Sequence, residues 1–109
     1  MKILEYRIAD FKAILEGDME WPWKSGLLPI CRQRLVAQVK NPRADDDDVA
    51  LLVGYDELGG VVSYLGVLPD YVELNRQRKK FGWLTTWWVS PDVDGLGAIS
   101  LLMRAIRLY

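Results

Sequence analysis

The 109-residue chain contains no histidine and only one cysteine, and its formal net charge is −1. Because Cys31 has no second thiol to pair with, an internal disulfide is excluded and a reducing compartment is expected. Without histidine the chain lacks the most common general base and the usual activator of a thiol. A nearly balanced charge argues against a chain that binds nucleic acid over its surface.

The sequence also lacks a signal-peptide run, an apolar stretch of membrane-spanning length, an internal repeat and a linker. These absences predict a cytoplasmic protein with no membrane partner. Half of the residues are hydrophobic and 27% are charged, which is typical of a globular domain. At this length we expect a single domain over residues 1–109.

The segment 81–90 has the clearest strand pattern in the sequence. Nearly all of its residues are apolar, β-branched or aromatic. Alternation places one set of side chains on one face (Phe81, Trp83, Trp87 and Val89) and a second set on the other (Leu84 and Trp88). Apolar side chains on both faces predict a central strand covered by helices, with Trp87 and Trp88 in the core. Pro91 cannot donate to a ladder and ends the strand.

From Leu96 onward the apolar spacing becomes helical. One stripe is predicted as the buried face: Leu96, Ile99, Met103 and Ile106, widened by Leu101, Ala105 and Leu108. Only the glycine-containing turn 92–97 therefore separates the strand from the helix. Free N–H groups and a positive dipole end at such a junction favour a phosphate group.

The N-terminal part reads as alternating short elements. Residues 2–16 have two interpretations: Leu4, Ile8, Phe11 and Leu15 have helical spacing, whereas residues 8–11 also fit a strand end followed by an Asp N-cap. Gly17 closes the helix of this segment, and an irregular loop is predicted over 18–26. A helix over 28–40 follows, with four residues on its buried face: Leu28, Cys31, Leu35 and Val39. Strands are then expected over 49–55 and 61–68, joined by a turn at 56–60, with a polar connection over 69–80. On this reading Cys31 is a packing residue.

Several polar or aromatic groups have both a functional and an ordinary interpretation. The run 45–48 is interpreted as a solvated acidic loop, since it lacks calcium-loop spacing. The basic run 76–80 is interpreted as a solvated connection. Trp21 and Trp23 either anchor their loop in the core or wall an acceptor pocket. Asp70 and Glu73 are the nearest carboxylates to the strand, but surface solvation is their ordinary role, and the catalytic base is left unassigned.

The segment 89–102, VSPDVDGLGAISLL, resembles the acetyl-CoA signature of the GNAT N-acetyltransferases. Val89, Pro91, Gly95 and Gly97 match that pattern, and a leucine-rich helix follows. Asp94 stands where the family usually has Arg or Gln, and Ile99 where it usually has Gly or Ala. A dinucleotide fingerprint is disfavoured because the third glycine is missing.

This resemblance implies an α+β fold: a mixed, mainly antiparallel GNAT-like sheet with flanking helices, truncated after the third helix. In the family layout a strand precedes the first helix, which implies a strand over 2–8 and a helix over 11–16. It further implies acetyl transfer from acetyl-CoA, as co-substrate, to an amine whose identity the sequence leaves open. The expected cofactor-binding residues are Val89, Gly95, Leu96, Gly97 and Ala98, with no metal.

The family's fifth strand and acceptor-site strands would follow the last helix. Their absence predicts an incomplete domain whose strand over 81–90 has a free edge. We therefore expect a homodimer or oligomer. The alternative function is a non-catalytic or truncated module that acts through self-association or protein binding.

Overall fold

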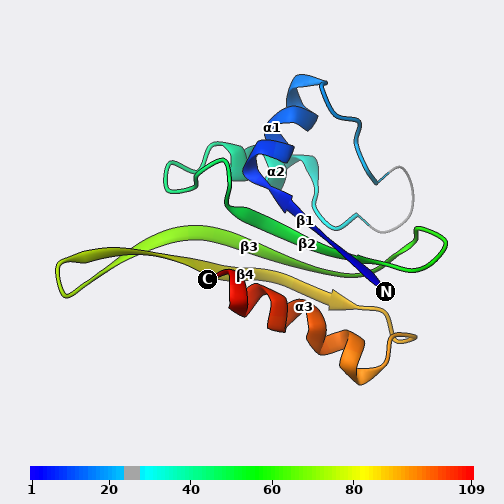
Figure 1. Ribbon diagram of the computed structural model, residues 1–109. Helices are drawn as coiled ribbons and strands as arrows, with labels where there is room; N and C mark the ends of the chain where they lie inside the picture. The colour runs from blue at the N-terminus through cyan, green and yellow to red at the C-terminus, as the bar shows by residue number, and fades with distance from the viewer. Residues whose placement is uncertain (24–27) are drawn as a thin grey trace.

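The computed structural model describes residues 1–23 and 28–109, which form one antiparallel four-stranded sheet and three helices (Figure 1). The elements follow the order β1 (Lys2–Arg7), α1 (Ile8–Glu16), α2 (Arg32–Val39), β2 (Val49–Tyr55), β3 (Val61–Leu74), β4 (Gln77–Val89) and α3 (Gly95–Leu108). The strands lie in the sheet in chain order, β1-β2-β3-β4. The predicted α+β class with an antiparallel sheet and flanking helices is confirmed.

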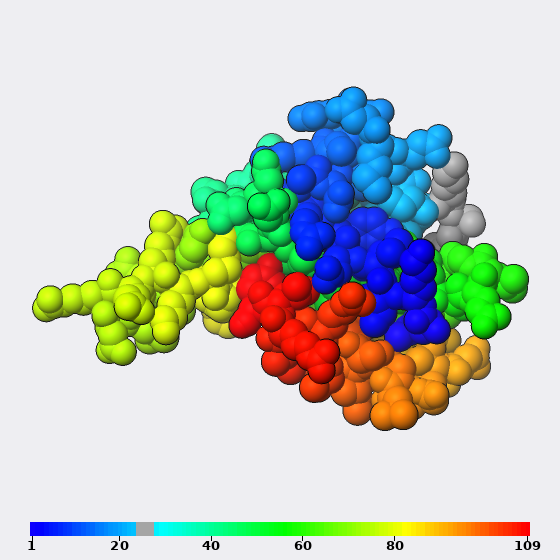
Figure 2. Space-filling view, viewed as in Figure 1, coloured from blue at the N-terminus to red at the C-terminus, as the bar shows by residue number. Residues whose placement is uncertain are grey.

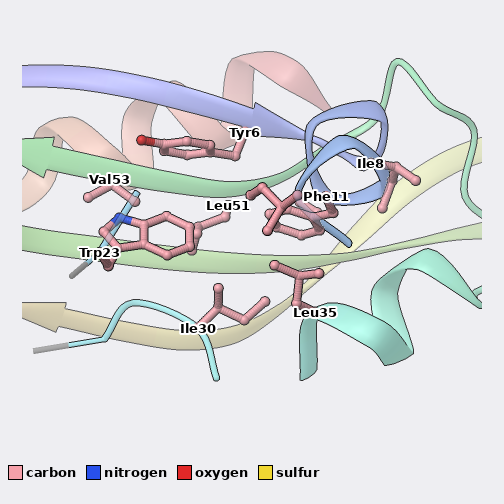
Figure 3. Packing of buried hydrophobic residues seen from close by; sticks show 10 residues of the cluster. Tyr6, Ile8, Phe11, Trp23, Ile30, Leu35, Leu51 and Val53 are labelled. Atoms are coloured by element: carbon pink, nitrogen blue, oxygen red, sulfur yellow. The ribbon is translucent and has the colours of Figure 1, made fainter. Parts of the chain in front are cut away.

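The helices form a layer on each face of the sheet. Helices α1 and α2 cover one face and α3 covers the other (Figure 1). The core under α1 and α2 is formed by side chains of β1, α1, α2, β2 and the segment between the two helices: Tyr6, Ile8, Phe11, Ile14, Trp23, Ile30, Leu35, Ala50, Leu51 and Val53 (Figure 3). The core under α3 is smaller: Val49, Leu52, Leu65, Val67, Leu101 and Ala105. Since β2 contributes to both cores, it is the strand buried on both faces.

Helix α1 begins earlier than predicted, and helix α2 begins later. Helix α1 begins at Ile8, because the Asp10 carboxylate accepts a hydrogen bond from the Arg7 N–H at 2.7 Å. This contact satisfies the backbone donor of the N-cap residue. It ends at Glu16, and Gly17 closes it as the C-cap, as predicted, with a φ of 83° that favours glycine. Residues 18–23 lie outside helices and strands, as the predicted loop requires, while 24–26 fall outside the described residues.

Helix α2 begins at Arg32 rather than at Leu28. Cys31 precedes it as the N-cap and is exposed, so the predicted burial of this thiol is wrong. The physical reason is that Pro29 and Ile30 take the chain into the core before the helix starts, which displaces the helical stripe. Leu35 is fully buried, as predicted, whereas Leu28 is 46% exposed.

The predicted polar connection over 69–80 is wrong. Strand β3 continues to Leu74, and β4 begins at Gln77 after a two-residue turn in which Asn75 and Arg76 have φ of 52° and 65°. Such left-handed pairs form the tight hairpin turns that match strand twist. Residues 71–80, which we call the arm, project beyond the helices (Figures 1 and 2). Because no helix covers the arm, its residues are largely polar and resemble a loop in sequence.

Strand β4 lies at the edge of the sheet, not in its middle. Trp83, Leu84 and Trp87 are 56%, 53% and 47% exposed, so the predicted coverage of both faces and the core position of Trp87 are wrong. Trp88 is partly buried and stacks on Tyr64 at 5.7 Å between ring centroids. Because β4 is an edge strand, its apolar side chains have a neighbouring strand on one side only, which leaves them partly exposed.

A bulge changes which side chains share a face of β4. Gly66 pairs with Thr86 and Val67 with Leu84, which leaves Thr85 without a partner on β3. Trp83 and Trp87 are consequently brought to opposite faces, because they pair with Leu68 and Leu65, which are three residues apart. The predicted common face for these two tryptophans is wrong for this reason.

Helix α3 contacts the sheet through Leu101 and Ala105, which are 0% and 4% exposed. The predicted stripe of Leu96, Ile99, Met103 and Ile106 is instead 46–84% exposed. Both stripes are apolar, so periodicity alone does not select between them. The hydroxyl of Tyr109 donates a hydrogen bond to the Val49 carbonyl at 2.6 Å and fixes the C-terminal end of α3 on β2.

Candidate functional site

The junction between β4 and α3 has the predicted strand–turn–helix arrangement. Val89 is the last residue of β4 and pairs with Ser63. The Ser90 N–H donates to the Val62 carbonyl at 2.8 Å, and the Val93 N–H donates back to the Ser90 carbonyl at 3.0 Å. The chain therefore reverses tightly after the strand and enters α3 at Gly95.

Asp94 caps the helix and uses some of the donors that a ligand would need. Its carboxylate accepts a hydrogen bond from the Gly97 N–H at 2.7 Å, and its carbonyl accepts one from the Ala98 N–H at 2.9 Å. Within residues 1–23 and 28–109, the N–H groups of Gly95 and Leu96 have no hydrogen-bond partner. Two of the four predicted backbone donors are thus free and two are occupied.

The two glycines of the motif have different structural roles. A Cβ at Gly97 would lie 2.5 Å from Cγ1 of Val93, so this position needs glycine for close packing against the turn. A Cβ at Gly95 would have no atom within 4 Å. Gly95 therefore leaves open space next to its free N–H group, where a ligand can approach the backbone.

An open depression of about 760 Å³ lies beside this junction. Four carboxylates line it: Asp56, Glu57, Asp92 and Asp94. Among the described residues that line it, none has a basic side chain. The free backbone donors fit a pyrophosphate, but the negative charge of the surrounding carboxylates, including that of Asp94, repels it.

A second, smaller cavity of about 250 Å³ lies on the other face of the sheet, between α2 and the bulge of β4. Its walls are mainly apolar: Pro29, Ile30, Ala37, Ala50, Leu51 and Leu68. Its polar groups belong to Arg34, Gln38, Thr85 and Thr86. The sequence did not reveal these residues as a site. The one available signal was the position of Gln38, which lies next to Leu35 and Val39 on the predicted buried face, where a polar side chain is unusual.

Trp23 belongs to the core rather than to either cavity. It is 3% exposed, and its Nε1–H donates to the Tyr55 hydroxyl at 2.9 Å. The Tyr55 hydroxyl in turn lies 2.6 Å from that of Tyr6, and burial with this contact raises the pKa of Tyr6. Trp21 packs edge-on against Trp23, with ring centroids 5.3 Å apart. Core anchoring is therefore the role that these contacts support, and Figure 3 shows Trp23 among the buried core residues.

The acidic run and the basic run pair with each other. Lys80 forms ion pairs with Asp45, at 3.1 Å, and with Asp48, and its ammonium lies over the Tyr71 ring. Burial alone lowers the pKa of Lys80, but the hydrogen bonds to Asp48, Tyr71 and Asp45 raise it overall. Hydrogen bonding from Tyr71 and Lys80 lowers the pKa of Asp45. These charges hold the base of the arm against the loop before β2.

Asp70 is also held by neighbouring groups. Trp83 Nε1–H donates to its carboxylate at 3.0 Å and Arg43 at 2.8 Å, and these contacts lower the pKa of Asp70 from 3.8 to about 2. A carboxylate with so low a pKa is a poor proton acceptor near neutral pH. Glu73 lies exposed on the arm. Neither residue is supported as a catalytic base.

Two general features of the described residues bear on function. No group of three or more histidine, cysteine or carboxylate residues in that part of the chain is arranged to hold a metal ion. No helix there is long and apolar enough to cross a membrane.

Comparison with known proteins gives the fold alone. No protein family matches the sequence, and no curated protein resembles it significantly. Among solved structures, a point mutant and a tetramutant of the BH1408 protein from Bacillus halodurans are similar, each with a TM-score of 0.52 and 20% identity. Each alignment covers 98% of this chain and 73% of the other.

Proposed function

We propose that the chain has a GNAT-like fold and that it transfers acetyl from acetyl-CoA to an amine. One observation carries this proposal: β1 is followed by two helices on one face, then by three antiparallel strands, and then by a helix on the opposite face. The motif that resembles the family signature lies at the β4–α3 junction of this arrangement. The likeness to BH1408 supports only the α+β arrangement and adds nothing to the GNAT assignment.

The residues at the junction have distinct roles in this proposal. The free N–H groups of Gly95 and Leu96 bind the pyrophosphate, and Val89 at the end of the β4 edge lies alongside the pantetheine. The bulge at Thr85 presents backbone groups that are not committed to β3, and bulges often lie next to active sites. In the reaction the amine nitrogen bonds to the thioester carbonyl carbon, the C–S bond breaks, and coenzyme A leaves as the thiol with the proton that the amine releases.

Calorimetry with coenzyme A tests the cofactor assignment. Gly95→Val places a side chain in open space beside the free N–H groups, so it should weaken binding about tenfold or more, the loss of a charge-assisted hydrogen bond. Ala9→Val, in the exposed first turn of α1, is the matched control and should leave affinity unchanged. Equal affinity of Gly95→Val and the parent chain would contradict the assignment.

Asp94 gives a test in the opposite direction. Asp94→Arg removes a carboxylate beside the phosphate position and adds a cation, so coenzyme A should bind about tenfold more tightly. Loss of the cap should cost about 1 kcal/mol of stability, which thermal unfolding measures. Asp47→Arg makes the same charge change in the exposed acidic loop and should not alter affinity. If both variants gain equally, the effect is not local to this turn.

Self-association is the second candidate function, and the exposed edge of β4 favours it. Within the described chain, β4 pairs only with β3, and Trp87 and the stripe from Leu96 to Ile106 add exposed apolar surface. Sedimentation at micromolar concentration should detect a homodimer or oligomer. Trp87→Lys should shift it toward monomer, whereas Leu58→Lys, at a 96% exposed turn position, should not. A stable 12.5 kDa monomer of the parent chain would exclude this function.

A further inference from the structure

The cavity between α2 and β4 is built from apolar walls around a few polar groups. Arg34, Ala37 and Gln38 come from one face of α2, because residues three and four apart in a helix are neighbours. Gly66, Thr85 and Thr86 face them from the β3–β4 bulge. This mixture of apolar walls and few polar groups is characteristic of small-molecule sites.

Gln38 presents an acceptor without a donor. The side chain is 6% exposed, and its Nε2–H donates to the Val67 carbonyl at 2.8 Å. A carbonyl only accepts, so this bond fixes which end of the amide is nitrogen. No donor among the described residues reaches the buried Oε1. An unpaired buried acceptor is unfavourable, and a ligand with an N–H group would satisfy it.

The bulge places two hydroxyl groups together in the same cavity. A Cβ on Gly66 would lie 2.4 Å from Oγ1 of Thr85 and 2.8 Å from Oγ1 of Thr86. Gly66 therefore leaves room for both hydroxyls over β3. Each hydroxyl can donate or accept, so the pair can bind an amine or a carboxylate.

The charge of the cavity selects among ligands. Arg34 is exposed at its mouth and has no ion-pair partner among the described residues, and no carboxylate lines the cavity. A simple ammonium ion would be buried next to Arg34 without a counter-charge, which is unfavourable. A ligand that carries its own carboxylate would satisfy Arg34 and compensate the amine.

We propose that this cavity binds an amino acid with an apolar side chain. Because Gln38 Oε1 is buried in the empty cavity, the Gln38 side chain shifts on binding so that its Oε1 accepts a hydrogen bond from the α-amino group. The carboxylate pairs with Arg34, and the side chain of the ligand packs on the apolar wall. The inference rests on the proposed acetyl transfer, for which this α-amino group is the acceptor, but its binding step is measurable without coenzyme A.

Three related probes test the proposal by NMR titration of the parent chain. L-Leucine carries both groups, isoamylamine has the same tail and amine without the carboxylate, and 4-methylpentanoate has the carboxylate without the amine. Leucine should shift the Gln38 side-chain amide and the Thr85 and Thr86 backbone amides saturably in the millimolar range. Each of the other probes should bind about tenfold more weakly, because each lacks one charge-assisted contact. Equal binding of all three probes, or no saturable shift with leucine, would overturn the proposal.

Variants separate the two contacts. Arg34→Gln should weaken leucine about tenfold and leave isoamylamine unchanged. Arg32→Gln makes the same change on the same helix outside the cavity and should have no effect. Gln38→Met should weaken the two amines but not 4-methylpentanoate. Loss of leucine affinity in Arg32→Gln equal to that in Arg34→Gln would contradict the assigned carboxylate contact.

A space-filling variant covers the case in which Gln38→Met does not fold. Ala37→Leu occupies the cavity from an exposed helical position and should abolish leucine binding, while Ala9→Leu on α1 should not. The two proposals fail separately. If leucine binds and coenzyme A does not, the acetyl-transfer proposal is refuted and the amino-acid site stands. If coenzyme A binds and leucine does not, only the amino-acid site is refuted.

Discussion

The packing of α3 gives the sharpest test of the architecture, because the helix has two apolar stripes and the sheet covers only one. We consider Leu101→Ala, in which the lost side chain is 0% exposed and belongs to the core under α3. Truncating a fully buried leucine costs about 2–5 kcal/mol, from lost transfer free energy and the cavity that remains. This is a large fraction of the 5–15 kcal/mol that is typical of a domain.

The matched comparison is Ile99→Ala, on the stripe that periodicity also allows as the buried one. Ile99 is 49% exposed, so its truncation should cost about 0.5 kcal/mol or less. Urea and thermal unfolding of dilute protein should show a fall in Tm of about 8–20 °C for Leu101→Ala and almost none for Ile99→Ala. Equal losses in the two variants would refute the orientation of α3.

Two further perturbations address single polar contacts. Asp70 has a lower pKa in the folded state, about 2 instead of 3.8, so its contribution to stability is present above about pH 4 and lost as the pH falls through about 2. Asp70→Asn should therefore reduce the loss of stability between about pH 5 and pH 2 in urea unfolding; an unchanged loss would show that the contacts with Arg43 and Trp83 do not act in solution. Tyr109→Phe removes the hydrogen bond to the Val49 carbonyl and should cost about 0.5–1.5 kcal/mol, and a neutral result would mean that water replaces the hydroxyl.

The element types were predictable where one local signal dominated. The buried strand β2, the stop at Pro91 and the left-handed Gly17 follow from side-chain pattern and backbone restriction alone. The turn from Val89 to Gly95 also lies where the motif places it. The coverage of β4 was not predictable, because whether an apolar strand is central or at an edge depends on which strands pair with it.

The errors share a physical cause in long-range pairing. The bulge at Thr85 exists only relative to β3, and it reverses the faces of the residues before it. The arm resembles a loop because its polar residues are stabilised by cross-strand pairing and by Lys80, not by burial. For the same reason the cavity beside Gln38 was missed, since its walls come from separate parts of the chain.

The arm also divides the molecule into regions that open on different timescales. Its two strands pair with each other beyond the reach of the helices (Figure 2). The ion pairs of Lys80 with Asp45 and Asp48 lie where the part of the sheet supported by other elements begins. Opening of the turn end therefore breaks ladder hydrogen bonds without exposing either core. Backbone amides near Asn75 should exchange with solvent through local opening, whereas those of β2 should exchange only when the whole domain unfolds.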